Sequence, residues 1–322
     1  LPLSTLYENE YGMQTSSDGI KYIVAGESFN ANFSFKYGGR DRVLSAYIFT
    51  DARGLFPYSM VISGAEREAH YMIDGALKNE VVKSDMHSTD THGYTEAVFG
   101  GTGLMKFSFA PRIKNVHNQH LYSFKFPSVY KQKKYPILPQ KRINSDLIRS
   151  HWDNILRLVV SIKLGEVTAS QVFKRLNSYS ADENPLYNAL KELGRIFKTK
   201  YILRYVDDQD LRKAVHKQLN KGESGNRLDR AFAIGRQDYT QTVKEDQELA
   251  ECCKRILKNV VVCWNFMYVS QKLVRAKNPI ERNAILQKVR VSSLLAWEHF
   301  ILHGEFDFSD ARLQDSQKFD FD

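Results

Sequence analysis

The sequence has few cysteines and no long hydrophobic run. Its three cysteines, Cys252, Cys253 and Cys263, are too few and too unsuitably spaced for a disulfide framework or a zinc site with paired ligands. We expect them to be thiols buried on helix faces. No apolar run approaches the roughly 18–20 residues that a membrane-spanning helix needs, and no signal peptide opens the chain. We therefore expect a cytoplasmic protein with no membrane partner.

The common motifs of nucleotide-binding and hydrolytic enzymes are also missing. The sequence has no P-loop, no Rossmann fingerprint and no Gly-x-Ser-x-Gly elbow, and we expect no small-molecule substrate. The densest acidic cluster, residues 207–210, is explained by capping of a helix that begins there. Four histidines could suggest a zinc site, but their spacing fits no common ligand pattern: His87, His92, His117 and His120.

The charge balance is basic. The 322 residues include 46 Lys and Arg against 37 Asp and Glu, which gives a net charge of +9 and an isoelectric point near 9.2. Such a balance favours a polyanionic partner, with nucleic acid first. The length suits one large domain or two moderate ones. Because the chain begins at Leu1 and not at methionine, we treat it as a fragment of a longer protein.

The first 113 residues carry strand and helix patterns in a definite order. Three strands of an antiparallel meander are followed by a helix, a strand, a glycine-containing helix and a last strand. The expected elements are, in chain order, residues 20–24, 29–35, 43–49, 66–78, 81–90, 93–105 and 106–113. This order is that of a ribonuclease-H-like core, an α/β fold with a mixed sheet and flanking helices.

The segment 111–145 differs in composition. It holds eight basic residues and no acidic one, with aromatic residues between them. Such interleaving suits contact with a phosphate backbone and exposed bases, although a merely solvated basic linker is the alternative. Three prolines, Pro127, Pro136 and Pro139, predict an extended connection and not a helix.

Helical patterns dominate after residue 150. Trp152 begins an apolar stripe and is expected in the core. The later helices are expected from Asn184 to Phe197, from Asp207 to about Phe232, from Leu249 to Val274, and from Pro279 to near His303.

The polar stretch 84–96 is the best candidate for a functional site. Asp90 lies between His87 and His92, and a buried carboxylate is costly unless a cation or partner neutralises it. A solvated turn is the alternative. In a ribonuclease-H-like core, acidic residues on the first strand, after the fourth strand and on a later helix are expected to act together. Asp18, Asp90 and Glu223 occupy these places.

Two of these assignments have competitors. Asp41 and Asp51 lie in or near turns of the same meander as Asp18. Glu223 follows Leu219 at a spacing of four on one helix stripe, and an ordinary salt bridge to Arg227 is the alternative explanation for its position. Three carboxylates from distant segments can share two divalent metal ions for phosphoryl transfer.

Five short segments resemble the catalytic region of the Tn-three family of replicative transposases, which are bacterial DDE enzymes. They are Ser-Ser-Asp-Gly at 16–19, the run from His87 to Glu96, Phe-Ala-Pro-Arg-Ile at 109–113, His-Trp-Asp-Asn-Ile-Leu-Arg at 151–157, and Leu-Asn-Lys-Gly-Glu at 219–223. They occur in the family's order, and the resemblance extends over most of residues 11–275. The resemblance implies that Asp18, Asp90 and Glu223 form the catalytic triad and bind two Mg²⁺ ions, which Mn²⁺ can replace.

The resemblance also implies an organisation and an activity. Residues 1–114 would form the first part of the core, 115–205 a basic linker and helical insertion, and 206–322 the glutamate helix and C-terminal helices. The enzyme would nick transposon 3′ ends and join them to target DNA, as a homodimer on terminal inverted repeats and target DNA. A nuclease without strand transfer and an inactive DNA-binding module are the alternatives.

Supporting residues follow from charge and position. His87 and His92 flank the second aspartate and are expected to orient it or to contact DNA. The residues expected to bind DNA are Arg112, Lys125, Lys131, Lys133, Lys134, Lys141, Arg142, Arg227, Arg230 and Arg236.

Overall fold

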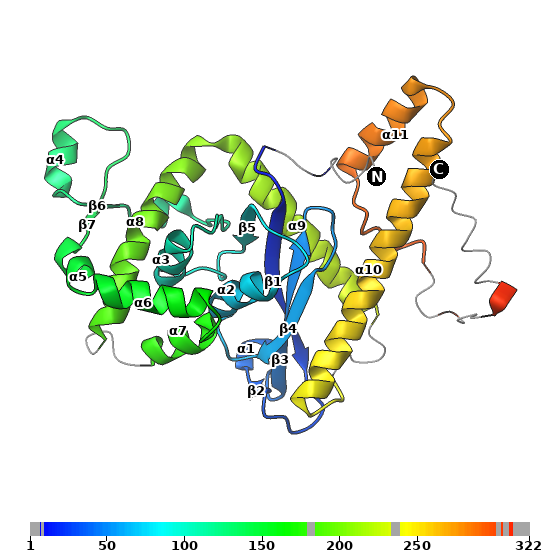
Figure 1. Cartoon of the computed structure of the whole chain (residues 1–322), viewed down its shortest axis with the longest axis horizontal. Helices are drawn as coiled ribbons and strands as arrows, with labels where there is room; N and C mark the ends of the chain where they lie inside the picture. Colours follow the sequence, from blue (N-terminus) through cyan, green and yellow to red (C-terminus); the bar gives the residue numbers. More distant parts are fainter. Residues whose placement is uncertain are drawn as a thin grey trace. The chain divides into compact units, whose positions relative to one another are not determined.

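The computed structural model describes residue 7 and residues 10–178, 184–232, 239–300, 304 and 309–311, and it divides the chain into two compact units. Unit 1 comprises residues 1–13, 19–66 and 220–322, and unit 2 comprises residues 14–18 and 67–219. Strand β1 (Gln14–Ile23) and helix α9 (Gln209–Ala231) each contribute to both units (Figure 1).

Unit 1 contains the antiparallel part of the sheet. β3 (Arg42–Asp51) pairs with β4 (Tyr58–Ser63) from Leu44 opposite Ser63 to Phe49 opposite Tyr58. The two-residue strand β2 (Asn32–Phe33) pairs with the start of β3, and β1 lies next to β3 in the sheet. The long helix α10 (Lys244–Val274) packs along β4 (Figure 1). Side chains from these elements and from the end of α9 form one apolar core.

The expected strand at 29–35 is wrong, and a strand at 58–63 takes its place. Phe29, Phe33 and Phe35 alternate as a strand pattern requires, but they are 101, 65 and 92 % exposed. In the part of the chain that the structure describes, no apolar layer covers these three rings, so burial does not stabilise a longer strand. The chain instead forms β2 and the single-turn helix α1 (Phe35–Gly38).

A cluster of charged side chains lies inside unit 1. Lys258 Nζ on α10 is 2.8 Å from Asp229 Oδ1 on α9 and 3.6 Å from Glu251 Oε1, and all three residues are at most 1 % exposed. The hydroxyls of Tyr22 and Tyr239 donate to Asp229 and Glu251. Burial raises the pKa of the Glu251 carboxyl above its ordinary value. The buried ammonium group therefore neutralises carboxylates that would be costly to bury alone.

Unit 2 contains the parallel part of the sheet. β5 (Met86–Thr89) runs parallel to the start of β1, with Gln14 opposite Met86 and Ser17 opposite Thr89. On the other side of β5, the chain from Ser108 to Arg112 runs alongside it through three backbone hydrogen bonds of 2.8 Å. Only Phe109 forms a regular bridge, to His87. The predicted strand at 106–113 is therefore a short extended segment.

Helices pack closely around this parallel part. α2 (Glu68–Lys78) lies against α7 (Ala169–Asn177), and α3 (Glu96–Leu104) lies against α8 (Pro185–Asp207) (Figure 1). A Cβ atom at Gly194 would be 1.7 Å from the backbone oxygen of Glu96, and one at Gly100 would be 2.7 Å from that of Leu190. Only glycine lets the two helices approach this closely. The predicted helices at 66–78 and 93–105 are confirmed within a few residues.

The basic segment is not wholly extended. It forms the single-turn helix η2 (Val116–Asn118), β6 (Tyr122–Ser123), helix α4 (Pro127–Gln132) and β7 (Lys141–Arg142). Pro127 occupies the first turn of α4, where its missing N–H costs nothing. The proline that was expected to prevent a helix therefore begins one. β6 and β7 pair in parallel.

Two further expectations fail at helix surfaces. α5 (Ser145–Ser150) leads into α6 (Trp152–Lys163), which buries Ile155, Val159 and Ile162 but leaves Trp152 39 % exposed at its first residue. The cysteines of α10 are half-buried (Cys252) or exposed (Cys253 and Cys263), because that helix turns other residues toward the core. They are not the buried thiols that we expected.

The last helix is shorter than expected. α11 (Pro279–Val291) ends well before His303, which lies outside the described residues. The following turns are held by Asn265 of α10, whose side-chain amide donates to the backbone oxygens of Leu294 and Ala296. Among the helices that the structure describes, none has the length and apolar character to cross a membrane.

Candidate active site

Asp18 and Asp90 each directly follow one member of a facing residue pair on two neighbouring strands. Ser17 of β1 is opposite Thr89 of β5, and each aspartate is the next residue along its parallel strand. Because neighbouring strands lie about 4.8 Å apart, we expect these two carboxylates from distant parts of the sequence to lie close together at the carboxyl end of β5. This is the edge of a sheet where parallel strands commonly present functional side chains.

The Asp90 carboxylate is held by its own turn. Its Oδ1 accepts hydrogen bonds from the backbone N–H groups of His92 at 2.8 Å and Gly93 at 3.0 Å. A Cβ atom at residue 93 would lie 2.5 Å from the Cβ of Thr89, so the turn requires glycine. Within the described residues both hydrogen bonds end on Oδ1, which leaves Oδ2 available to a ligand.

His87 joins the two strands that carry the aspartates. Its ring is 1 % exposed, with Nδ1 2.7 Å from Thr15 Oγ1 and Nε2 2.8 Å from Ser17 Oγ. Burial lowers the pKa of His87 to about 3. A neutral ring can donate through one nitrogen and accept through the other. His87 therefore fixes the strand that leads to Asp90, and its burial keeps it from DNA. His92, by contrast, is exposed.

We expect the stability of unit 2 to depend on pH through His87. The pKa is about 3 in the folded chain and about 6.5 when unfolded, so between these values only the unfolded state binds the proton. The free energy of unfolding should therefore fall by about 1.4 kcal/mol for each pH unit as the pH decreases through this window, and the contribution is complete above pH 6.5.

The measurement is urea unfolding at pH 6 and pH 4, for the parent and for His87→Gln. Fluorescence of Trp152 reports on unit 2 when Trp264 and Trp297 of unit 1 are replaced by phenylalanine. The carboxylates of the chain titrate equally in both proteins. The difference between the two proteins in the slope of unfolding free energy against pH therefore isolates His87. Equal slopes would contradict the assignment.

Glu223 lies on α9, as the helical pattern predicts. In unit 2 the Gln218 side-chain amide donates to Ser16 Oγ at 3.2 Å, which fixes this part of α9 against β1 two residues before Asp18. Val215 and Leu219 are buried, and Glu223 is exposed. Glu223 belongs to unit 1, whereas Asp18 and Asp90 belong to unit 2.

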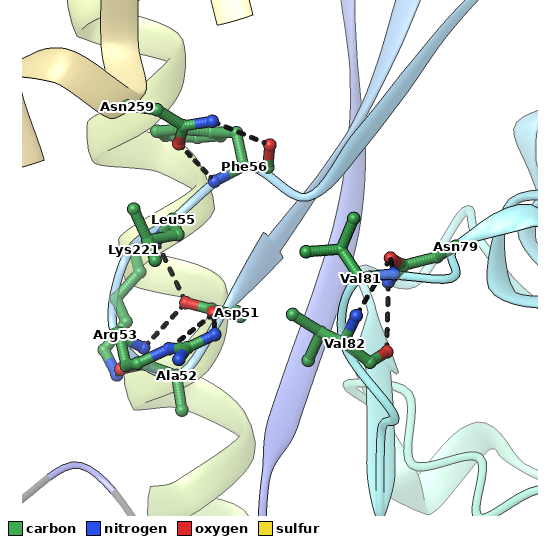
Figure 2. Close-up of polar contacts among 10 residues, drawn as sticks. All are labelled: Asp51, Ala52, Arg53, Leu55, Phe56, Asn79, Val81, Val82, Lys221 and Asn259. Carbon is green, nitrogen blue, oxygen red and sulfur yellow. Dashed lines mark hydrogen bonds and ion pairs between the residues drawn. The ribbon is translucent and has the colours of Figure 1, made fainter. Parts of the chain in front are cut away.

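The competitors of Asp18 have other surroundings. Asp51 is fully buried, and its carboxylate accepts hydrogen bonds from the Arg53 guanidinium and from the backbone N–H groups of Arg53 and Leu55 (Figure 2). Beside it, Lys221 of α9 donates to the backbone oxygen of Ala52 (Figure 2). Asp51 therefore organises the turn between β3 and β4. Asp41 is exposed in the turn before β3.

The aspartate pair fits a divalent cation by the chemistry of its donors. Carboxylate oxygens are the ligands that Mg²⁺ and Mn²⁺ prefer, and the hydrogen bonds of the Asp90 turn use only Oδ1. In the portion of the chain that the structure describes, no three acidic, histidine or cysteine side chains are gathered as a metal site. The pair can thus hold part of a metal's coordination shell, and further ligands must come from elsewhere.

The predicted DNA-binding residues have different settings. Arg112 is half-buried, and its backbone N–H donates to Thr89 beside Asp90. Arg227 and Arg230 are exposed on α9, and Arg236 lies outside the described residues. The remaining basic residues are exposed around α4, β6 and β7: Lys125, Lys131, Lys133, Lys134, Lys141 and Arg142.

The comparison with known proteins now decides the family. The family model described as "Tn3 transposase DDE domain" matches residues 1–306. The chain belongs to this family. The domain is 33 % identical to the transposase for transposon Tn1546 of Enterococcus faecium over 305 residues, and this alignment covers 94 % of the chain. It is 34 % identical over 314 residues to the transposase for transposon Tn501 of Pseudomonas aeruginosa, with 96 % of the chain covered.

These relatives are longer proteins. The domain spans about 30 % of the length of the curated transposases that it matches, 30 % for Tn1546 and 31 % for Tn501. The resemblance that we identified from five short segments is therefore confirmed at the level of the family. The roles of Thr15, Ser17 and Gln218 in positioning the strands of this Tn3 transposase domain were not predicted. The two serines directly before Asp18 were a signal.

Proposed function

We propose that this chain is the catalytic part of a DNA transposase that nicks transposon 3′ ends and joins them to target DNA. The observation that carries the proposal is the pairing of Ser17 with Thr89, the residues directly before Asp18 and Asp90, in a chain whose family match extends over residues 1–306. We further propose that the mixed sheet and its helices form a ribonuclease-H-like core, with residues 115–205 as a helical insertion before the glutamate helix.

The chemistry assigns a role to each acidic residue. Asp18 and Asp90 would hold two divalent cations, and we propose Glu223 as the third carboxylate, five residues and about 7.5 Å further along α9 than Gln218. When bound, Mg²⁺ or Mn²⁺ supplies Lewis-acid stabilisation of the attacking and leaving oxygens. The turn at Asp90 and the ring of His87 keep the carboxylates fixed before substrate arrives, so no reorganisation is needed during reaction.

The basic surface of unit 2 would bind the DNA backbone. Transposon-end and target DNA are both polyanions, and the exposed lysines around α4 lie in a segment with no acidic residue. Arg112, beside the Asp90 strand, and Arg227 and Arg230 of α9 would contact phosphates near the reacting bond. We propose that the enzyme acts as a homodimer that holds two transposon ends.

Replacement of two neighbouring lysines should weaken DNA binding in a salt-dependent way. Lys133→Glu with Lys134→Glu should reduce affinity for a duplex and flatten the dependence of log K on log salt by about 0.9 for each phosphate that the variant no longer neutralises. Electrophoretic or anisotropy titrations between 50 and 200 mM salt measure both quantities.

A matched control makes the same charge change elsewhere in unit 2. Lys163→Glu with Lys174→Glu alters exposed residues of α6 and α7 and should leave the salt slope near that of the parent. An unchanged slope for the Lys133 and Lys134 variant would show that the basic segment is only solvated.

The test of function uses the full-length transposase with a pre-nicked, labelled transposon end and supercoiled target in Mg²⁺. Joined product is the expected result. Cleavage without joining would support a nuclease of the same core, and binding without either reaction would support an inactive DNA-binding module. Either outcome would replace the proposal.

A further inference from the structure

We propose that a cavity beside α8 receives an unpaired base of DNA, an inference that rests on the proposed DNA-binding function. The cavity lies wholly within unit 2 and has a volume of about 870 Å³. That volume is within the range of about 300–1,000 Å³ that is common for ligand sites. It is separate from the aspartate pair, because neither aspartate nor its turn lines it.

One wall of the cavity is a face of α8. Thr199, Leu203 and Val206 follow one another at helical spacing along the C-terminal half of that helix. β6 lies beside this face (Figure 1), because the backbone N–H of Tyr122 donates to Thr199 Oγ1 at 3.1 Å. This hydrogen bond joins two of the elements that line the cavity.

The opposite wall is aromatic. Tyr130 of α4 and Tyr135 after it have ring centroids 6.4 Å apart, and their planes are tilted by 42°. Tyr135 and Phe124 are half exposed, at 50 and 57 %, so their rings are open to a ligand. Every nucleobase has a flat π-face that stacks on such rings, whatever its sequence.

Two features favour a base over an apolar protein segment. Arg204 lines the cavity, and the exposed cations Lys125 and Arg142 belong to a segment with no acidic residue that supplies other lining residues. Arg142 Nε donates to the backbone oxygen of Phe124, which lines the cavity, and its guanidinium lies 4.5 Å from the centroid of the Phe126 ring, so its charge is held at the rim of the cavity. A phosphodiester backbone complements such a rim, whereas an apolar protein segment would leave its charge unmatched.

A single carboxylate supplies a polar contact inside the cavity. Asp207 is the last residue of α8 and is exposed, and it lines the cavity. A helix C-terminus is an unfavourable place for a negative charge. In the cavity, the Asp207 carboxylate can accept hydrogen bonds from the exocyclic amino group of adenine, cytosine or guanine. Thymine lacks such a group.

The experiment compares two DNA duplexes bound by the 322-residue chain. One carries a central unpaired 2-aminopurine nucleotide, and the other has the same nucleotide paired with thymine. We expect the chain to bind the first about 10-fold more tightly, which is a typical value for one base stacked on an aromatic ring. The 2-aminopurine fluorescence should fall on binding, because stacking quenches it.

Variants locate the effect. Tyr130→Ala with Tyr135→Ala, or Tyr135→Ala alone, should bring the ratio of the two affinities close to one. Binding of the paired duplex should stay within 2-fold of the parent, which shows that the fold is intact. Trp152→Ala removes another exposed aromatic ring of unit 2, outside the cavity, and should keep the 10-fold ratio.

The outcomes separate this inference from the proposed function. Equal affinity of the parent for both duplexes, or an unchanged ratio in the tyrosine variants, would overturn the cavity assignment and leave DNA binding in place. Failure to bind either duplex would count against the DNA-binding function itself. If the tyrosine variants change only the sedimentation of the chain, the cavity holds a second copy, and the inference is wrong.

Discussion

Asp90→Asn is expected to abolish both nicking and joining by the full-length transposase. Asparagine keeps the oxygen that accepts the backbone N–H groups of His92 and Gly93, so the turn should persist. The negative charge is lost, and with it the attraction for a divalent cation. Removing one group that stabilises charge in a transition state typically costs about 10²–10³ in rate, and loss of a metal should cost at least that. Asp18→Asn should have the same effect.

The measurement is the rate of joined-product formation in Mg²⁺ with a pre-nicked transposon end. Asp41→Asn is the matched control, because it makes the same chemical change at an exposed turn of unit 1. It should retain the parental rate. An Asp90→Asn enzyme with more than a tenth of the parental rate, or an inactive Asp41→Asn enzyme beside an active Asp18→Asn enzyme, would contradict the assignment of the site.

Lys258→Met should destabilise unit 1 by about 3–5 kcal/mol, the usual cost of removing one partner from a buried ion pair. The substitution leaves Asp229 and Glu251 buried without their cation. Urea unfolding measures the change. In a Trp152→Phe background, the remaining tryptophans, Trp264 and Trp297, both belong to unit 1, so their fluorescence reports on that unit alone.

Two further variants test the cause of this loss. Lys272→Met changes an exposed lysine of the same helix and should alter the free energy of unfolding by less than about 0.5 kcal/mol. Combining Lys258→Met with Asp229→Asn and Glu251→Gln removes the uncompensated charges and should recover part of the stability. If the triple variant is less stable than Lys258→Met, packing and not charge explains the effect.

The order of elements around the aspartates could be predicted from the sequence because apolar periodicity is local. The helices at 68–78 and 96–104 and the strand that ends at Thr89 follow from such patterns. The matching register of Asp18 and Asp90 could not be predicted in this way. It depends on the contacts of His87 with Thr15 and Ser17, which join segments about 70 residues apart.

The buried charge cluster was missed for a similar reason. Lys258 lies four residues before Val262 and seven after Glu251, so it shares their buried face of α10. A lysine in a helical pattern normally indicates a solvated position. Its burial is compensated by Asp229, which comes from another helix. A local pattern contains no information about that partner.

The strand expected at 29–35, of which only β2 forms, and the exposed cysteines show the opposite failure. There the pattern was apolar, but the layer needed to cover it is absent from the described residues around Phe29, Phe33 and Cys263. Apolar character indicates where burial is favourable, and the neighbouring elements determine whether it occurs.

The crossing of α3 and α8 limits how related transposases can diverge. At Gly194 any side chain would enter the space of the Glu96 backbone oxygen, and backbone cannot be exchanged by mutation of a neighbouring residue. A second substitution can relieve a clash between two side chains, but it cannot relieve a clash with a backbone atom. Among functional descendants of this sequence, residues on either side of the crossing can change together, but position 194 is expected to tolerate no replacement in a saturation library selected for transposition.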